Sequence, residues 1–178
     1  MRIGFDIDGV IVDTISAAAV AISDFLGCEV TCEDVIFRFD EIHEVHDYWI
    51  KNAHKFLCCS PPIEGVCAHI NELLNEHELY FISARGIELL DESRNWFENY
   101  GLPKDNLFFT SGEPKAGVCK ELGLDLFIED SPKNAQEIAL AGIPVLLMET
   151  EYNKDYADEK IVRCKDWDEL MQKISSYI

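Results

Sequence analysis

The sequence predicts an α/β fold in which a doubly wound parallel sheet carries a small helical cap, inserted directly after its first strand. From residue 79 onward, short apolar runs alternate with amphipathic helical segments, a pattern typical of a parallel sheet covered by helices on both faces. The segment of about fifty residues before Glu64 shows no strand pattern and is too long for an ordinary connection. We therefore assign residues 1–13 and 64–178 to the core and residues 14–63 to the cap.

The individual elements follow from periodicity and from the residues that start and stop helices. An apolar strand ends at Phe5, and Asp13 and Thr14 can cap the next helix. Gly27 can end that helix. Helical spacing of apolar residues predicts helices at residues 14–26, 45–57, 65–76, 89–100, 116–122, from 132 onward and 166–174. Apolar runs predict strands at residues 79–83, 107–109, 124–128 and 143–148, the last of the sheet.

Composition narrows the class of protein. With 178 residues, of which 48% are hydrophobic, the chain can form one domain with a full core and a small insertion. No apolar run is long enough to span a bilayer, and the strand pattern begins at the first residues, so we expect no membrane contact and no signal peptide. Seven cysteines, an odd number, indicate reduced thiols in the cytoplasm.

The charge of the chain bears on its partners. A formal net charge of −19 argues against nucleic acid as a partner, because two polyanions repel each other. An anionic substrate would need a site that overcomes this field locally, with a metal ion and a few basic groups. The acids are densest at residues 149–159, which we interpret as a solvated loop.

Two acids follow the end of the first strand. Asp6 and Asp8 stand two positions apart, Gly9 comes next, and apolar residues lie on both sides. An unpaired buried carboxylate is costly, so acids at this place need partners such as a divalent cation and a phosphate group. Gly9 would let the backbone turn tightly and approach a ligand closely.

The stretch FDIDGV, residues 5–10, resembles the first motif of the haloacid-dehalogenase (HAD) superfamily, most of whose members are Mg²⁺-dependent phosphohydrolases. Three further motifs are similar to those of the superfamily and occur in the same order. They are a hydroxyl residue that closes a strand (Ser83), a lysine just before a helix (Lys115), and acids at a strand end (Glu129 and Asp130). The resemblance covers residues 1–13 and 64–148 and implies a HAD-like core.

The resemblance also implies roles for the acids. Asp6 would attack phosphorus and form an aspartyl-phosphate, and Asp8 would protonate the leaving oxygen and then activate water. Mg²⁺, which prefers oxygen ligands, would be held by Asp6, by Asp130 and by the backbone carbonyl of Asp8. Glu129 would reach the metal through water or only tune it.

Other residues would bind the phosphate. Ser83 and nearby backbone N–H groups, such as that of Ala84, would bind phosphate oxygens, and Lys115 at a helix start would keep both Asp6 and the phosphate charged. Arg85 follows closely and would either contact the substrate or form a surface ion pair.

Within the superfamily, the string DIDGVIVD, the chain length and the helical insertion resemble the 5′(3′)-deoxyribonucleotidase-like group, which implies a nucleoside monophosphate substrate. Aromatic residues of the cap could stack a base or only pack the cap on itself. These aromatic residues, with the basic residues among them, are Phe37, Phe39, Tyr48, Trp49, Phe56, Arg38, Lys51 and Lys55. Two alternatives stay open: a sugar-phosphate phosphatase or phosphomutase of the same superfamily, and a non-catalytic module that binds phosphate or metal.

Overall fold

The structure, a computed structural model, describes residues 1–37 and 43–177. Residues 38–42 and 178 lie outside this description, as do the side chains of residues 36, 37, 43, 44, 46, 49 and 50. Four of the cap residues considered above for base stacking or substrate contact therefore lie outside the described part: Arg38, Phe39 and the side chains of Phe37 and Trp49.

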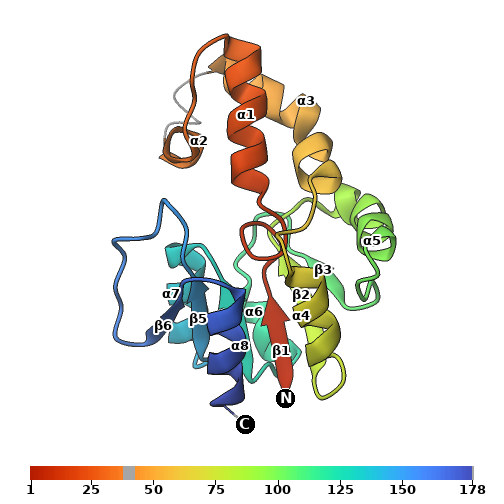
Figure 1. The fold of residues 1–178 in the computed structure, drawn as a ribbon, viewed down its shortest axis with the longest axis vertical. Helices are drawn as coiled ribbons and strands as arrows, with labels where there is room; N and C mark the ends of the chain where they lie inside the picture. The colour runs from red at the N-terminus through yellow and green to blue at the C-terminus, as the bar shows by residue number, and fades with distance from the viewer. Residues whose placement is uncertain (38–42, 178) are drawn as a thin grey trace.

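Six parallel strands form one sheet in the order β3-β2-β1-β4-β5-β6, with β1 between β2 and β4 (Figure 1). Crossovers between parallel strands need a helix or long connection, which explains the alternation of strand and helix in the sequence. The predicted α/β class with a doubly wound parallel sheet is confirmed. The strands are β1 (Arg2–Phe5), β2 (Glu78–Ser83), β3 (Leu107–Phe109), β4 (Leu126–Glu129), β5 (Val145–Met148) and β6 (Ile161–Cys164).

Strand β6 corrects one prediction, because residues 143–148 were expected to form the last strand of the sheet. The strand has only four residues, lies at the edge of the sheet and pairs with β5 alone. Its Val162 is 40% exposed. A strand this short and this exposed shows no apolar run, so its pattern did not stand out from the charged segment before it.

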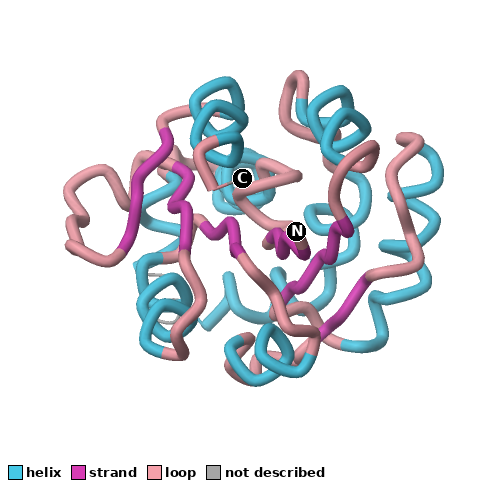
Figure 2. Tube along the Cα trace, turned by 90° about the horizontal axis from the view of Figure 1, so that it is seen from below, coloured by secondary structure: helices cyan, strands magenta, loops and turns pink. Residues whose placement is uncertain are grey.

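Helices cover both faces of the sheet (Figure 2). Alternate residues of a strand point to opposite faces; thus Phe81 packs in one buried cluster with α4, α5 and α8, and Ile82 packs in another with α6 and α7. A 3₁₀ turn, η2 (Ile87–Leu89), leads into α5. The covering helices are α4 (Val66–Leu73), α5 (Leu90–Asn99), α6 (Ala116–Glu121), α7 (Pro132–Leu140) and α8 (Trp167–Ser175).

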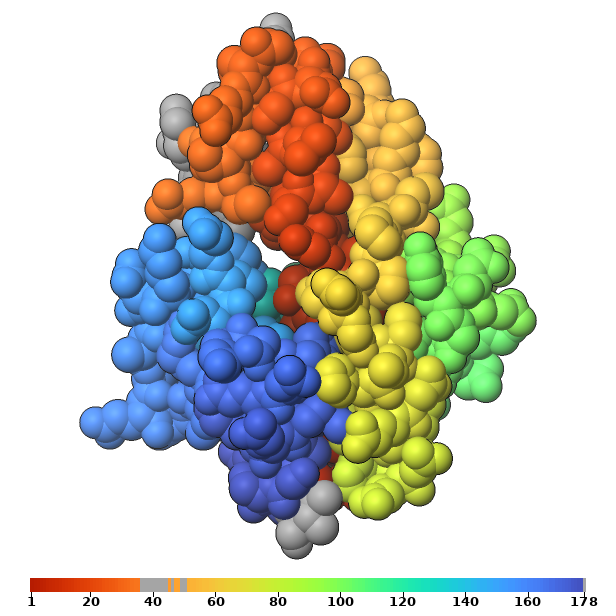
Figure 3. All heavy atoms as spheres, in the orientation of Figure 1, coloured from red at the N-terminus to blue at the C-terminus, as the bar shows by residue number. Residues whose placement is uncertain are grey.

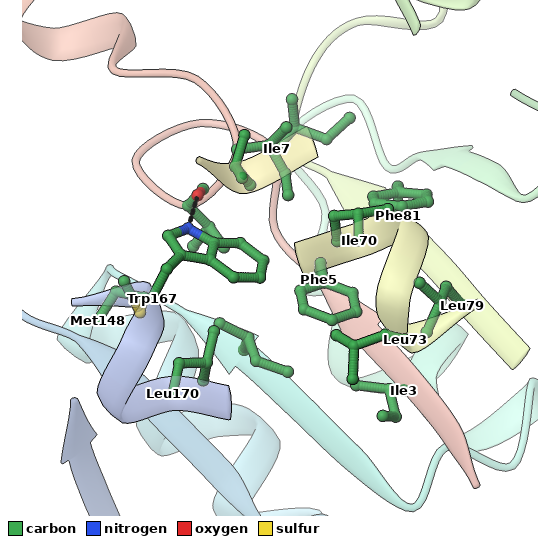
Figure 4. Packing of buried hydrophobic residues seen from close by; sticks show 14 of the residues in the cluster. Ile3, Phe5, Ile7, Ile70, Leu73, Leu79, Phe81, Met148, Trp167 and Leu170 are labelled. Carbon is green, nitrogen blue, oxygen red and sulfur yellow. Dashed lines mark hydrogen bonds between the residues drawn. The ribbon is translucent and has the colours of Figure 1, made fainter. Parts of the chain in front are cut away.

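The C-terminal helix α8 supports the loop that follows β1. The Trp167 ring stacks on Phe5 at a centroid distance of 5.8 Å, and Phe5 stacks in turn on Phe81 at 5.8 Å. The indole N–H of Trp167 donates to the carbonyl oxygen of Val10 at 3.0 Å (Figure 4). A buried indole N–H needs such a partner, so α8 and the β1 loop hold each other in place.

Three helices stand beyond the carboxyl ends of the strands (Figure 1), and we call them the cap helices. They share a buried cluster of their own that contains Ile22, Val35, Val45 and Phe56. The shortest, α2, falls in a stretch where the sequence has no clean period. No helix among residues 1–37 and 43–177 has the length and apolar content to cross a membrane. The cap helices are α1 (Thr14–Leu26), α2 (Cys32–Phe37) and α3 (His43–Cys59).

The predicted ends of α1 are confirmed. The carboxylate of Asp13 accepts a hydrogen bond from the backbone N–H of Ser16 at 3.1 Å, as an N-cap residue does. At the other end Gly27 takes the left-handed conformation, with φ of 67°. The first turn of α1 therefore starts at a defined point just after the β1 loop.

Candidate active site

The candidate site lies at the carboxyl ends of the three central strands. In register, Phe5 of β1 lies beside Phe81 of β2 on one side and Ile128 of β4 on the other. Side chains that directly follow these positions therefore emerge at one edge of the sheet, where open α/β folds bind ligands. This edge brings together Asp6, Asp8, Ser83, Arg85, Glu129 and Asp130, and Lys115 joins them from the start of α6.

A buried lysine joins two of the acids. Lys115 Nζ lies 2.6 Å from Asp6 Oδ2 and 2.9 Å from Glu129 Oε2. Its side chain is 2% exposed. Asp6, Glu129 and Asp130 each present a carboxylate oxygen, and these oxygens lie within 4.8 Å of one another. Three acids thus share one cation in a site that water barely reaches.

The buried acids outnumber the lysine, and this imbalance of charge shifts their pKa values. Burial, followed by the charge of Glu129, raises the pKa of Asp6 well above its usual value, although Lys115 opposes the change. Burial and the charge of Glu129 likewise raise the pKa of Asp130. Burial also disfavours the ionised form of Glu129, but the charge of Lys115 and the hydrogen bonds to the carboxylate together hold the pKa of Glu129 below its usual value. The arrangement therefore lacks positive charge.

The donor set fits a divalent cation. Carboxylate oxygens are the ligands that Mg²⁺ prefers, and a divalent ion would supply the missing positive charge. Gly9 keeps the space open: its φ is +81°, and a Cβ at this position would overlap Asp130 Oδ2. Asp6, Asp130 and Glu129 are the side chains that could hold such an ion. A metal contact from Asp8 stays a prediction for its backbone carbonyl, because its carboxylate is engaged elsewhere.

The carboxylate of Asp8 is held by Arg85. Arg85 Nε donates to Asp8 Oδ2 at 2.9 Å, and Nη2 donates to Oδ1 at 2.7 Å. Burial disfavours the ionised form of Asp8, but the positive charge of Arg85 and the hydrogen bonds to the carboxylate lower its pKa. The sequence offered a substrate contact or a surface ion pair for Arg85. The ion pair exists, but it is buried, because only 3% of the Arg85 side chain is exposed.

Ser83 lies beside Asp8 and ends β2. Its hydroxyl donates to Asp8 Oδ2 at 3.1 Å and accepts a hydrogen bond from the backbone N–H of Arg85 at 3.2 Å. Ala84 follows and is exposed. Phosphate binding by Ser83 and Ala84 stays a prediction, since the serine hydroxyl is bonded to a carboxylate here.

Several residues of the site carry no signal in the sequence. Thr14, the first residue of α1, donates to Asp8 Oδ1 at 2.6 Å. The Tyr152 hydroxyl bonds to Asp130 Oδ2, and the Asn153 amide donates to the backbone oxygen of Asp130 at 2.7 Å. Residues 149–159 were expected to be a solvated loop. That expectation is wrong for residues 152 and 153, because these two side chains turn inward onto a predicted metal ligand.

Two cavities flank the β1 loop. One of about 380 Å³ is lined by Gly9, Ile15 and Tyr152, among others, and Figure 3 shows a hollow on this face between the cap helices and the segment after β5. The other, of about 460 Å³, has Asp8 in its wall together with aliphatic side chains of the cap and of η2. A molecule bound next to Asp8 would therefore lie between the cap helices and the core.

The described cap aromatics mostly pack on each other. Phe56 is 3% exposed inside the cap cluster. The Tyr48 ring stacks on Phe25, with the ring centroids 4.3 Å apart. Packing is thus the better interpretation for both Tyr48 and Phe56. Of the basic residues, Lys55 is exposed and donates to Asn52 at 2.9 Å.

A comparison with protein families decides the class of protein. Residues 1–177 match the family described as 5′ nucleotidase, deoxy (pyrimidine), cytosolic type C protein. The chain belongs to this nucleotidase family.

Two bacterial relatives are similar along the chain. Nucleotidase CA_C3379 of Clostridium acetobutylicum is 29% identical over 133 residues, which is 75% of this chain and 66% of that protein, just under two thirds. BH1399 of Halalkalibacterium halodurans, a candidate nucleotidase, is 28% identical over 192 residues, covering 99% and 94% of the two chains.

Solved structures agree on the fold. A HAD family hydrolase from Deinococcus radiodurans R1, with bound phosphate and sodium, superposes with a TM-score of 0.68 at 15% identity, covering 99% of this chain and 95% of that one. YfnB of Bacillus subtilis, a candidate HAD-hydrolase bound to magnesium, has a TM-score of 0.69 at 16% identity and covers 98% of both chains. The chain therefore belongs to the nucleotidase family and has the fold of these HAD hydrolases, as the motifs predicted.

Proposed function

We propose that the protein is a Mg²⁺-dependent phosphomonoesterase that acts on nucleoside monophosphates through an aspartyl-phosphate. The observation that carries this proposal is the pairing of Asp6 with the buried Lys115, while Asp8, two residues further along the chain, is paired with Arg85. A carboxylate kept charged by a lysine can act as a nucleophile. A second carboxylate nearby can serve as acid and base.

The first half of the reaction would transfer the phosphoryl group. An Asp6 oxygen attacks phosphorus, the bond from phosphorus to the leaving oxygen breaks, and a proton passes from Asp8 to that oxygen. Asp8 is ionised beside Arg85, so it must first take up a proton; the negative charge of a bound phosphate favours this. Lys115 keeps Asp6 ionised and neutralises part of the phosphate charge.

The second half would release phosphate. Asp8, now without its proton, takes one from a water molecule while the water oxygen attacks phosphorus. The bond between phosphorus and Asp6 breaks, Asp6 returns to its first state, and Asp8 either keeps the proton for the next turnover or releases it to solvent. The sum is one monoester and one water converted to one alcohol and one inorganic phosphate.

Asp6 and Asp130, with Glu129 beside them, would hold the metal. When bound, Mg²⁺ supplies charge neutralisation for the acidic group and for the phosphate oxygens. Phosphoryl transfer depends mainly on such neutralisation and on positioning. The need is acute here because the chain carries a net charge of −19 and its substrate would be an anion.

The cap helices would enclose the organic part of the substrate. One part of the wall of the cavity next to Asp8 is aliphatic, with Ile15 from α1, Ala53 and Leu57 from α3, and Leu89 from η2, while Thr14, Arg85 and Glu88 make another part polar. An apolar wall suits the nucleoside face of a nucleotide and excludes water from the reacting centre. We therefore propose that residues 14–63 act as the substrate-binding cap of the core.

A release assay tests the proposal. Inorganic phosphate is measured from deoxyribo- and ribonucleoside monophosphates and from sugar phosphates, with Mg²⁺ and with a chelator. We expect Mg²⁺-dependent release from nucleotides, and the Asp6→Asn variant should lose about 10⁴-fold or more. Asp13→Asn is the matched control, since asparagine also caps a helix. Isomerised sugar phosphate without free phosphate would indicate a phosphomutase, and Mg²⁺ binding without any turnover would indicate a binding module.

A further inference from the structure

The carboxylate of Asp8 has no free acceptor position. Its Oδ1 accepts hydrogen bonds from Thr14 Oγ1 at 2.6 Å and Arg85 Nη2 at 2.7 Å. Its Oδ2 accepts from Arg85 Nε at 2.9 Å and Ser83 Oγ at 3.1 Å. An ionised carboxylate offers about four lone-pair sites, and all are occupied here. Arg85 fills two of them in the fork geometry, which fixes orientation better than a hydroxyl does.

Arg85 lines the same cavity as Asp8 but is far more buried. Only 3% of its side chain is exposed, against 25% for the side chain of Asp8. Its third bond runs from Nη1 to Ser93 Oγ on α5 at 2.9 Å, and Ser93 is completely buried. Three of the five N–H donors of the guanidinium are thus committed to the protein. A substrate next to Asp8 would therefore meet more of the carboxylate than of the guanidinium, although both residues line the cavity.

Ser93 continues this chain of contacts to the cap. Its hydroxyl lies 3.7 Å from the Sγ of Cys58 near the end of α3. Helices α3 and α5 also pack against each other. The row from Asp8 through Arg85 and Ser93 to Cys58 therefore crosses from the reacting centre to a cap helix.

The four hydrogen bonds to Asp8 would not all persist during the reaction. Ser83 has one hydroxyl hydrogen, and its predicted role as a phosphate ligand would direct that hydrogen to a phosphate oxygen. When Ser83 turns to the phosphate, one lone pair of Asp8 Oδ2 becomes free on the side of the leaving oxygen. Arg85 and Thr14 then remain to hold the carboxylate, and only Arg85 contacts both of its oxygens.

We propose that Arg85 is the positioning residue for the acid–base group Asp8, and that Ser93 of α5 holds the guanidinium at the angle this requires. The inference rests on the proposed function and names two residues on which its rate depends. Arg85 acts through Asp8 and does not bind the phosphate. Misplacing a reacting group by about 1 Å can cost about 10²-fold in rate, which sets the expected effect.

A double-mutant cycle tests the role of Arg85. Arg85→Met, Asp8→Asn and the double variant are compared in kcat and KM for one nucleoside monophosphate with Mg²⁺. We expect Arg85→Met to lower kcat about 10²-fold with KM unchanged, and the double variant to be no slower than Asp8→Asn alone, since residues that act as a unit are not additive. Losses that multiply, or a rise in KM with kcat unchanged, would overturn the proposal.

Two further variants keep the proposal testable if Arg85→Met does not fold. Circular-dichroism melting shows whether each variant is folded. Arg85→Lys keeps the charge but lacks the fork, and it should lose nearly as much kcat; full activity would overturn the proposal. Ser93→Ala should lower kcat by about 3- to 10-fold with KM unchanged, and an unchanged kcat would remove Ser93 from the account. Arg94→Met is the matched control, since Arg94 is half-exposed on the same helix and pairs only with Asp91 among the described residues.

Phosphate release by the protein without substitutions distinguishes a failure of the proposed function from a failure of the role of Arg85. If it releases no phosphate from any monoester with Mg²⁺, the proposed function fails, and the positioning role fails with it. If it is active and the two losses multiply, the function stands and only the role of Arg85 is wrong.

Discussion

Replacing Lys115 with methionine should both destabilise the protein and abolish its chemistry. Lys115 Nζ lies 2.6 Å from Asp6 and 2.9 Å from Glu129, and its side chain is 2% exposed. Methionine has a similar length and no charge, so the variant keeps the volume but leaves a group of buried acids without its cation. The two ion pairs disappear together, because one ammonium group makes both.

The size of the effect follows from this burial. Removing one partner of a buried ion pair costs about 3–5 kcal/mol. For a chain of this length each kcal/mol lowers the melting temperature by about 2–4 °C, so we expect a drop of about 6–20 °C in the metal-free protein. Protonation of Asp6 would relieve part of this cost, because burial and Glu129 already raise its pKa and the charge of Lys115, which opposes them, would be gone.

Protonation of Asp6 in the Lys115→Met variant removes the nucleophile. A neutral Asp6 does not attack phosphorus, and a cation next to the phosphate is lost, so phosphate release should fall by at least about 10²-fold. The metal-free variant should also become more stable as the pH falls from neutral. The folded form then binds protons that the unfolded carboxylates, with lower pKa, still lack. Stability should decline again as the pH rises through the raised pKa.

The assay pairs circular-dichroism melting with phosphate release. Lys120→Met is the matched control, since Lys120 lies exposed on the same helix α6, and it should change neither quantity. An unchanged melting temperature together with full activity in Lys115→Met would refute the reasoning, because it would mean that the acids need no cation. Activity lost without any change in stability would refute the energetic half alone.

Three further outcomes are expected. Gly9→Ala should weaken Mg²⁺ binding in calorimetry and lower stability by about 1–2 kcal/mol, because φ is +81° and the new Cβ would overlap Asp130; unchanged Mg²⁺ affinity would contradict the proposed metal position. Burial raises the pKa of Cys119 to about 12, so its thiol should resist a thiol reagent at pH 8 until urea unfolds the chain, and its contribution to stability should decline only as the pH rises from about 9 toward 12; rapid labelling of the native protein would contradict its burial. Trp167→Phe keeps the stacking but loses the hydrogen bond to Val10, which should cost about 1–3 kcal/mol in urea unfolding; a variant as stable as the parent would show that this bond contributes nothing.

The sequence predicted the parts of the fold that repeat a period or end at a defined residue. Helix α1 was predicted with the bounds found, because Asp13 and Gly27 start and stop it. Helix α8 was predicted at residues 166–174 and is found at Trp167–Ser175. Its first turn is held by two hydrogen bonds: Asp166 accepts from the Glu169 N–H at 2.8 Å, and Glu169 accepts from the N–H of Lys165 at 2.8 Å.

The contacts that complete the site were beyond the sequence. The spacing of strand ends brings Ser83 near Asp6 and Asp8, because parallel strands share an edge. Nothing in the spacing tells that Arg85 turns toward Asp8 and Ser93, since a side chain two residues beyond a strand can point anywhere. Such pairings depend on tertiary packing across 77 positions of sequence separation.

Two segments were misjudged for the same physical reason. Strand β6 and the loop before it are rich in charge, and charge usually marks a solvated surface. Here a few inward residues decide the structure: Asn153 is 1% exposed and Arg163 donates to its backbone oxygen at 2.8 Å. Isolated inward side chains create no period, so pattern-based inference does not find them.

The central claim is that Asp6 carries the phosphoryl group during turnover, and chemical trapping tests it most directly. The protein is mixed with a nucleoside monophosphate and Mg²⁺, quenched in acid and treated with borohydride, which reduces an acyl phosphate to an alcohol. Peptide mass spectrometry should then find homoserine in place of Asp6 and an unmodified side chain at Asp8 and Asp130. Release of phosphate with Asp6 unmodified, or a reduced residue at another position, would contradict the account.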